Sequence, residues 1–134
     1  MPVWWELVRD ALSMRPHTHD ALPDLRDLDV ERVQVQGTHY LPNDRERQRS
    51  GDRLYVLRRQ PRRRDPHAIA VFADGRGVGF IPSARAAVLS PLLEELGGAA
   101  VVNGLGSSGD SVRLWLELPT ESALRDYVST VAAA

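Results

Sequence analysis

The fold is decided by residues 68–81, AIAVFADGRGVGFI. The first five residues of this stretch are small, β-branched or aromatic, which is typical of a strand. Residues 73–77 contain an Asp-Gly pair and predict a hairpin turn, because glycine readily adopts the positive φ that such turns need. Residues 78–81 are again apolar at most positions and are expected to pair back on the first strand. The sequence therefore predicts an antiparallel hairpin here.

Further strands and helices are expected on both sides of this hairpin. Strand-favouring patterns occur at 30–36, 53–59, 99–102 and 112–118, and a glycine-serine turn is expected at 103–110. Apolar residues at helical spacing predict helices at 3–14, 83–96 and 120–132. Ser83 and Thr120 are the expected N-caps, and Ser90-Pro91 offers an alternative start for a second short helix within 83–96.

This order of elements predicts an α+β fold. It fits a small, partly open antiparallel β-barrel, a modified form of the oligonucleotide-binding (OB-like) barrel, with one inserted helix and flanking N- and C-terminal helices. Periodicity alone leaves other α+β arrangements open. The 134 residues suffice for one domain. We expect a helix and an acidic connector at 1–29, the barrel at 30–118 and the C-terminal helix at 119–134.

The basic residues are unevenly distributed. All 17 are arginine, and 18 acidic residues bring the net charge to −1, so no overall field attracts nucleic acid. Nine arginines nevertheless lie between positions 45 and 64, where only Glu46 and Asp52 oppose them. This window predicts a surface that binds an acidic partner. The alternative is a solvated loop that the acidic connector, residues 16–31, neutralises.

Several classes of protein are not expected. The chain has no cysteine, which excludes disulfide scaffolds and cysteine-based zinc or thiol chemistry. No apolar run approaches the ~20 residues that span a bilayer, and the first residues do not resemble a secretory signal, so we expect a cytoplasmic protein without a membrane partner. His17, His19 and Asp20 are a weak metal motif because no regular element orients them. No cofactor, metal site or catalytic arrangement is predicted, and we expect a protein that is not an enzyme.

Four short motifs follow one another along the chain. They are Gly37 with Tyr40, Arg59-Gln60-Pro61, Asp65-Pro66-His67-Ala68-Ile69, and Val78-Gly79-Phe80-Ile81-Pro82 before a helix rich in alanine and leucine. In this order and spacing they resemble the HIRAN domain family, in its stand-alone bacterial-type form. The resemblance covers roughly residues 30–118.

The resemblance implies a module that binds single-stranded DNA and, in some members, captures its 3′-hydroxyl end. The family's pocket positions correspond here to His39, Tyr40, Asp65 and Phe80. The sequence departs from the family pattern in four places: Leu41 replaces a second tyrosine, Arg62-Arg63-Arg64 replaces Asn-Pro-Tyr, His67 replaces an asparagine, and Ser83 replaces a basic residue.

The residues themselves favour the same chemistry, because a single-strand binder needs cations for the backbone and flat side chains for the bases. The candidates for the backbone are Arg58, Arg59, Arg62, Arg63 and Arg64, and those for the bases are Tyr40 and Phe80.

Structural interpretations of these residues stay open. Asp65 also suits a cap of the turn before Pro66, and Tyr40 and Phe80 also suit packing in the barrel. The competing functional hypothesis is a protein-interaction or scaffold domain, or an accessory subunit of a helicase or nuclease, without a DNA pocket. Trp4 and Trp5 on the first helix and Tyr127 on the last are expected to pack on the barrel. If they are exposed instead, the terminal helices are the expected surface for a protein partner.

Overall fold

The computed structural model describes residues 22–37, 50–107 and 113–133. The expected first helix at 3–14, the metal motif at 17–20 and the candidate site residues His39 and Tyr40 lie outside these ranges. The predictions made for them therefore stay predictions.

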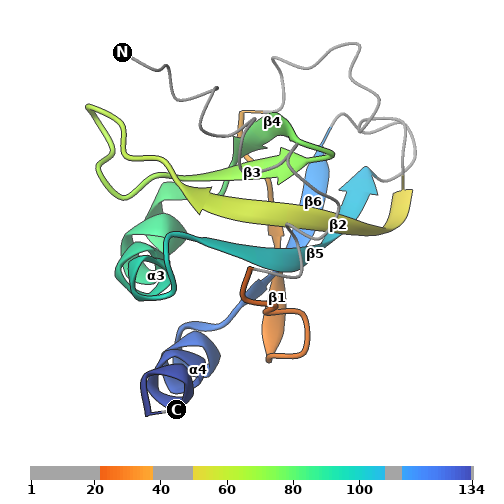
Figure 1. The fold of residues 1–134 in the computed structure, drawn as a ribbon. Coiled ribbons are helices and arrows are strands. Elements are labelled where there is room, and N and C mark those ends of the chain that lie inside the picture. The colour runs from red at the N-terminus through yellow and green to blue at the C-terminus, as the bar shows by residue number, and fades with distance from the viewer. Residues whose placement is uncertain (1–21, 38–49, 108–112, 134) are drawn as a thin grey trace.

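Six strands form one antiparallel sheet, followed and interrupted by two helices (Figure 1). The elements are β1 (Val30–Gln34), β2 (Ser50–Arg59), β3 (Ile69–Ala73), β4 (Arg76–Phe80), α3 (Ser83–Glu95), β5 (Ala99–Ser107), β6 (Leu114–Pro119) and α4 (Glu121–Ala133). The strand order across the sheet is β1-β6-β5-β2-β3-β4. The predicted α+β fold and the hairpin at 68–81, which forms β3 and β4, are confirmed.

The two edges of the sheet approach each other beyond the end of β1. Val35 N–H donates to Leu114 O over 2.8 Å, which keeps the chain beside β6. Gln36 N–H then donates to Phe80 O over 2.6 Å, and Phe80 N–H donates to Gln36 O over 2.9 Å. This isolated bridge joins the β1 side of the sheet to β4 at one point. The sheet is thus a barrel that is only partly closed, as the sequence predicts.

The main core lies between the inner face of the sheet and the two helices. Alternate residues of β2, Tyr55 and Leu57, point into it, as does Val71 of β3. Leu93 of α3 and Leu124 of α4 close it from the other side, where the two helices lie next to each other (Figure 1). Burial of this apolar surface is the main stabilising contribution to the fold.

The opposite face of the sheet, which we call the outer face, carries a second and smaller cluster. Val56, Ala70 and Phe72 are buried there, and Leu22 and Phe80 pack against them. Directly opposite residues of an antiparallel pair share a face, so the pairs Val56↔Phe72 and Ala70↔Phe80 confirm this assignment.

Among the described residues, neither helix has the length and apolar character that a membrane-spanning helix needs.

Two local predictions about helix α3 and strand β5 are wrong, and the alternative start of a second helix at Ser90-Pro91 does not occur. Pro82, not Ser83, is the N-cap of α3, and no side chain caps this end. The helix also continues through Pro91, because its buried face holds both halves against the core; a proline removes only one internal hydrogen bond. Residues 103–107 extend β5 instead of forming a turn, since β2 and β6 pair with both of its edges.

The start of α4 follows the prediction made for it. Thr120 caps this helix, because its Oγ1 accepts a hydrogen bond from Ala123 N–H over 3.2 Å. Tyr127, on the same helix, is partly buried against the main core. The aromatic residue of the C-terminal helix is therefore part of the packing between α4 and the sheet.

Candidate nucleic-acid interface

A pocket of about 370 Å³ lies where the two edges of the sheet meet. Three parts of the chain form it: the Gln36–Phe80 bridge with Gly37, the loop between β2 and β3, and the first residues of α3. Its lining residues are Gln36, Gly37, Arg62, Asp65, Phe80, Ile81, Pro82 and Ser83. Three predicted site residues, Arg62, Asp65 and Phe80, are thus brought together from the loop and from β4.

The loop between β2 and β3, residues 60–67, is here called the arginine loop. Arg62 N–H donates to Asp65 O over 2.8 Å, and Asp65 N–H donates to Arg62 O over 3.0 Å. This tight turn places Arg63 and Arg64 at its tip. The loop projects away from the sheet (Figure 1), and all three consecutive arginines are exposed.

No described carboxylate lies within ion-pair distance of the three arginines of this loop. In the described part of the acidic connector, Asp24 pairs instead with Arg26, with 2.7 Å between Oδ2 and Nη2. Hydrogen bonds from the Arg26 guanidinium, partly opposed by desolvation, hold the pKa of Asp24 below its usual range. Within residues 22–31, the connector therefore does not neutralise the arginine loop.

Phe80 lines the pocket from the outer face. A β-bulge lies opposite Val71 and Phe72, which pair with Gly79 and Gly77. The extra residue, Val78, points into the main core, whereas Phe80 packs on the outer face. Regular alternation of side chains along a strand predicts that Val78 and Phe80 lie on the same face. The bulge, which the sequence pattern does not reveal, puts them on opposite faces. The Arg62 guanidinium lies over the ring of Phe80, 4.6 Å from its centroid, a cation–π contact.

Asp65 takes the turn-capping role that the sequence leaves open, and it also lines the pocket. Its Oδ1 accepts a hydrogen bond from His67 N–H over 3.2 Å, the turn-capping role. Its Oδ2 accepts one from the hydroxyl of Ser83 over 3.2 Å, at the start of α3. The carboxylate is therefore fixed by the loop on one side and by the helix on the other, while it lines the pocket.

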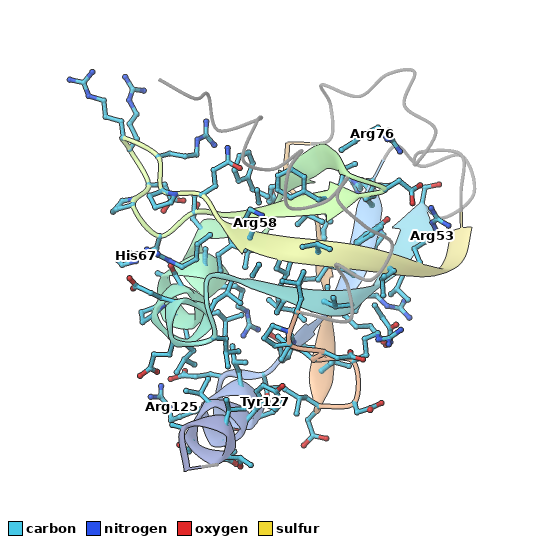
Figure 2. The ribbon with its side chains drawn as sticks, in the orientation of Figure 1. Arg53, Arg58, His67, Arg76, Arg125 and Tyr127 are labelled. Carbon is cyan, nitrogen blue, oxygen red and sulfur yellow. The ribbon has the colours of Figure 1, made fainter. Side chains whose placement is uncertain are left out.

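Arg58 and Arg59 are neighbours in β2 and point to opposite faces of the sheet. Arg59 turns toward α3, where its Nε donates to Ser90 Oγ over 2.8 Å and its Nη1 lies 3.6 Å from Glu94 Oε1. Arg59 therefore anchors the helix and does not join the exposed arginines. Arg58 stands on the outer face opposite Ala70 (Figure 2), and burial lowers its pKa.

The chain is similar to known proteins in both sequence and structure. A family model described as the HIRAN domain matches residues 29–118, two thirds of the chain. The chain belongs to the HIRAN family. The HIRAN domain of human HLTF has a similar crystal structure, with a TM-score of 0.50 and 19% sequence identity over 75% of this chain and 87% of that one. A search of curated proteins finds no match.

Family membership supports a function, and the structural similarity supports the fold. The HIRAN family is known for DNA binding, and membership supports a nucleic-acid-binding module. The similarity to the human domain, at 19% identity, shows the fold alone.

Five lining residues of this HIRAN domain are not among the predicted site residues: Gly37, Ile81 and Pro82, which belong to the quoted family motifs, and Gln36 and Ser83, which carry no such expectation. Gln36 reaches the pocket through its backbone pair with Phe80, a long-range contact that no local pattern indicates. Ser83 is predicted as a helix cap, but its hydroxyl donates to Asp65 instead. Its position directly after Ile81-Pro82, where the family pattern has a basic residue, is the signal that could have marked it.

The described residues contain no group of three or more histidine or acidic side chains placed to hold a metal ion.

Proposed function

We propose that this HIRAN protein binds single-stranded DNA, with the 3′-terminal nucleotide in the pocket and the preceding phosphates on the arginine loop. The observation that carries the proposal is the pocket itself, where Asp65 and Phe80 line one hollow and Arg62 lies over the aromatic ring. The exposed Arg63 and Arg64 extend the same positive surface.

Each side chain has a chemistry that suits this ligand. An ionised carboxylate only accepts hydrogen bonds, so Asp65 suits the 3′-hydroxyl of a terminal sugar as a donor. An aromatic face stacks on a base, and each such contact contributes ~1–3 kcal/mol. Because the Arg62 guanidinium already covers the ring of Phe80, a base stacks either on this planar cation or in its place.

Two residues enter the proposal from the sequence alone. His39 and Tyr40 follow Gly37, which lines the pocket, by two and three positions. We propose Tyr40 as a second stacking face and His39 as a phosphate contact at mildly acid pH, where imidazole carries a charge. Arg59 is left out of the interface because its guanidinium is bound to Ser90 and Glu94.

The proposal is tested by reversing the charge of the arginine loop. The variant changes Arg62, Arg63 and Arg64 together to Glu, and the affinity for a 5′-labelled oligo-dT is measured by fluorescence anisotropy. We expect binding to be lost, because three attractive contacts to phosphate become repulsive.

A matched control carries the same change in net charge elsewhere. Arg26, Arg32 and Arg125 are also exposed but lie outside the pocket, and their joint change to Glu should leave most of the affinity. Equal losses in both triple variants would mean that only overall charge matters. Unchanged binding of the loop variant would contradict the proposal and favour the protein-interaction hypothesis.

A further inference from the structure

Arg58 is a partly buried cation that the protein leaves without a described counterion. It lies on the outer face, flanked by Ala99 on β5 and Ala70 on β3. Its Nε is buried and has no hydrogen-bond partner. Burial lowers its pKa, and no acid among the described residues offsets this effect. Desolvating a charge costs free energy unless a partner compensates it, so folding alone does not explain an arginine here.

The arginines on either side of Arg58 in β2, unlike Arg58, each bind an acidic residue of the domain. Arg53 pairs with Asp74, with 3.2 Å between Nη2 and Oδ2. Arg59 is bound to Ser90 and Glu94 of α3. Both have a partner within the domain. A residue whose charge is buried without a partner lowers the stability of the folded protein. Such residues are often ligand contacts, because the ligand supplies the missing partner.

The position of Arg58 relative to the pocket indicates what kind of ligand compensates it. The register places Arg58, Ala70 and Phe80 side by side across β2, β3 and β4. Neighbouring strands are about 4.8 Å apart, so Arg58 and Phe80 are separated by roughly 10 Å along the sheet. Ala70 lies between them in the small outer-face cluster and is itself buried, because Leu22 and Phe80 pack against this cluster. The helices cover the other face (Figure 1).

We infer that Arg58 forms a second anion site, which binds an internal phosphodiester of the strand whose 3′ end lies in the pocket. The strand then extends from the pocket to β2, roughly 10 Å away across the sheet, so the interface contacts more than the terminal nucleotide. This inference rests on the proposed function, and it adds a path and a second phosphate contact to it.

The first test separates this site from the pocket by the length of the ligand. The affinities of wild type and Arg58→Gln are compared for dT2 and for dT8. We expect the substitution to weaken dT8 binding about tenfold, the effect of one charge-assisted contact, and to leave dT2 binding within twofold. Arg58→Lys should restore most of the dT8 affinity. An equal loss for both lengths, or no loss for either, overturns the inference.

The second test locates the contact on the DNA. Single phosphodiesters of dT8 are replaced in turn by uncharged methylphosphonates. At one internal linkage the replacement should weaken wild-type binding several-fold and leave the affinity of Arg58→Gln unchanged, because the charge pair is already absent. Equal effects in both proteins at every linkage contradict the inference. Failure of wild type to bind either oligonucleotide contradicts the proposed function instead.

Thermal unfolding gives a readout without DNA. Arg58→Gln removes an uncompensated charge, so its Tm should equal or exceed that of wild type. The matched variant Arg59→Gln breaks the contacts to Ser90 and Glu94, and its Tm should fall while dT8 affinity stays within twofold. A lower Tm for Arg58→Gln with unchanged dT8 affinity would assign Arg58 a structural role and overturn the inference.

Discussion

Gly79 lies where the two edges of the sheet meet, and its lack of a side chain makes this contact possible. A Cβ at this position would lie 2.3 Å from Gln36 O and 2.6 Å from Val35 Cγ1. Its φ of +154° is also one that other residues rarely adopt. The bridge that Gly79 permits holds Gln36 and Phe80 together, and both residues line the pocket.

We therefore predict that Gly79→Ala destabilises the protein by about 3 kcal/mol, from the clash with backbone and the strained φ together. The corresponding fall in Tm is roughly 10 °C for a domain of this size. Differential scanning calorimetry measures it. Gly97→Ala is the control, since Gly97 also has a positive φ but nothing lies within 4 Å of its Cβ position. A fall no larger than that of the control would show that the close approach is unimportant.

Asp65 is expected to determine which kind of DNA end the pocket accepts. Its carboxylate suits a 3′-hydroxyl as a donor and repels a 3′-phosphate by like charge. We predict that wild type binds an oligonucleotide with a 3′-hydroxyl about tenfold more tightly than the same oligonucleotide with a 3′-phosphate. A factor of about ten is the contribution of one hydrogen bond to a charged group. In Asp65→Asn this ratio should approach one, chiefly because 3′-phosphate binding improves when the repulsion is removed.

Asn keeps an oxygen that can accept from His67 N–H, so the turn is expected to survive the substitution. The two dissociation constants are measured for each protein by anisotropy competition. A wild-type protein with equal affinity for both ends would remove Asp65 from the proposed pocket. A ratio that Asp65→Asn leaves unchanged would assign the preference to another residue.

At the scale of elements, the sequence predicts what depends on local pattern. The hairpin at 68–81 forms β3 and β4, and Thr120 caps α4 as its type and position indicate. In both cases the side chains and the turn residues favour the structure that the whole fold requires. The predicted OB-like barrel is likewise confirmed, because the six strands form one antiparallel sheet that is only partly closed and the fold is similar to that of a HIRAN domain.

The features that local patterns do not determine are those decided by contacts between distant residues. Residues 103–107 have the composition of a turn, but hydrogen bonds to β2 and β6 hold them in β5. Pro91 has the character of a helix breaker, yet burial of Leu89 and Leu93 on both sides of it keeps α3 continuous. Packing overrides local propensity in both places.

The candidate site likewise contains residues that local sequence patterns indicate and residues that only the fold brings to it. Three residues that the sequence patterns single out, Arg62, Asp65 and Phe80, line the pocket, and their part in binding stays a prediction. The patterns do not separate Arg58 from Arg59, because neighbours in a strand face opposite sides and only the fold shows which side has a helix to bind. Nor do they indicate Gln36, whose pocket position depends on the closure of the sheet.

For the whole molecule, the expected affinity for DNA depends on where the charges lie more than on the net charge. The net charge of −1 gives no overall attraction to DNA, so screening it with salt should hardly change the affinity. The proposed interface makes a different prediction, because it places four cations, Arg58, Arg62, Arg63 and Arg64, on phosphates. Each neutralised phosphate of a single strand contributes about −0.7 to the slope of log K against log salt, so the expected slope is roughly −3.

We thus expect affinity for dT8 to fall about 50-fold between 50 and 200 mM salt, as measured by anisotropy titration at several concentrations. Arg58→Gln should reduce the slope by about 0.7, the contribution of one phosphate contact. The variant with Arg26, Arg32 and Arg125 changed to Glu should keep the wild-type slope, because those arginines lie outside the interface. A wild-type slope near zero would mean that stacking and hydrogen bonds alone hold the strand, and the arginine loop would then have no part in binding.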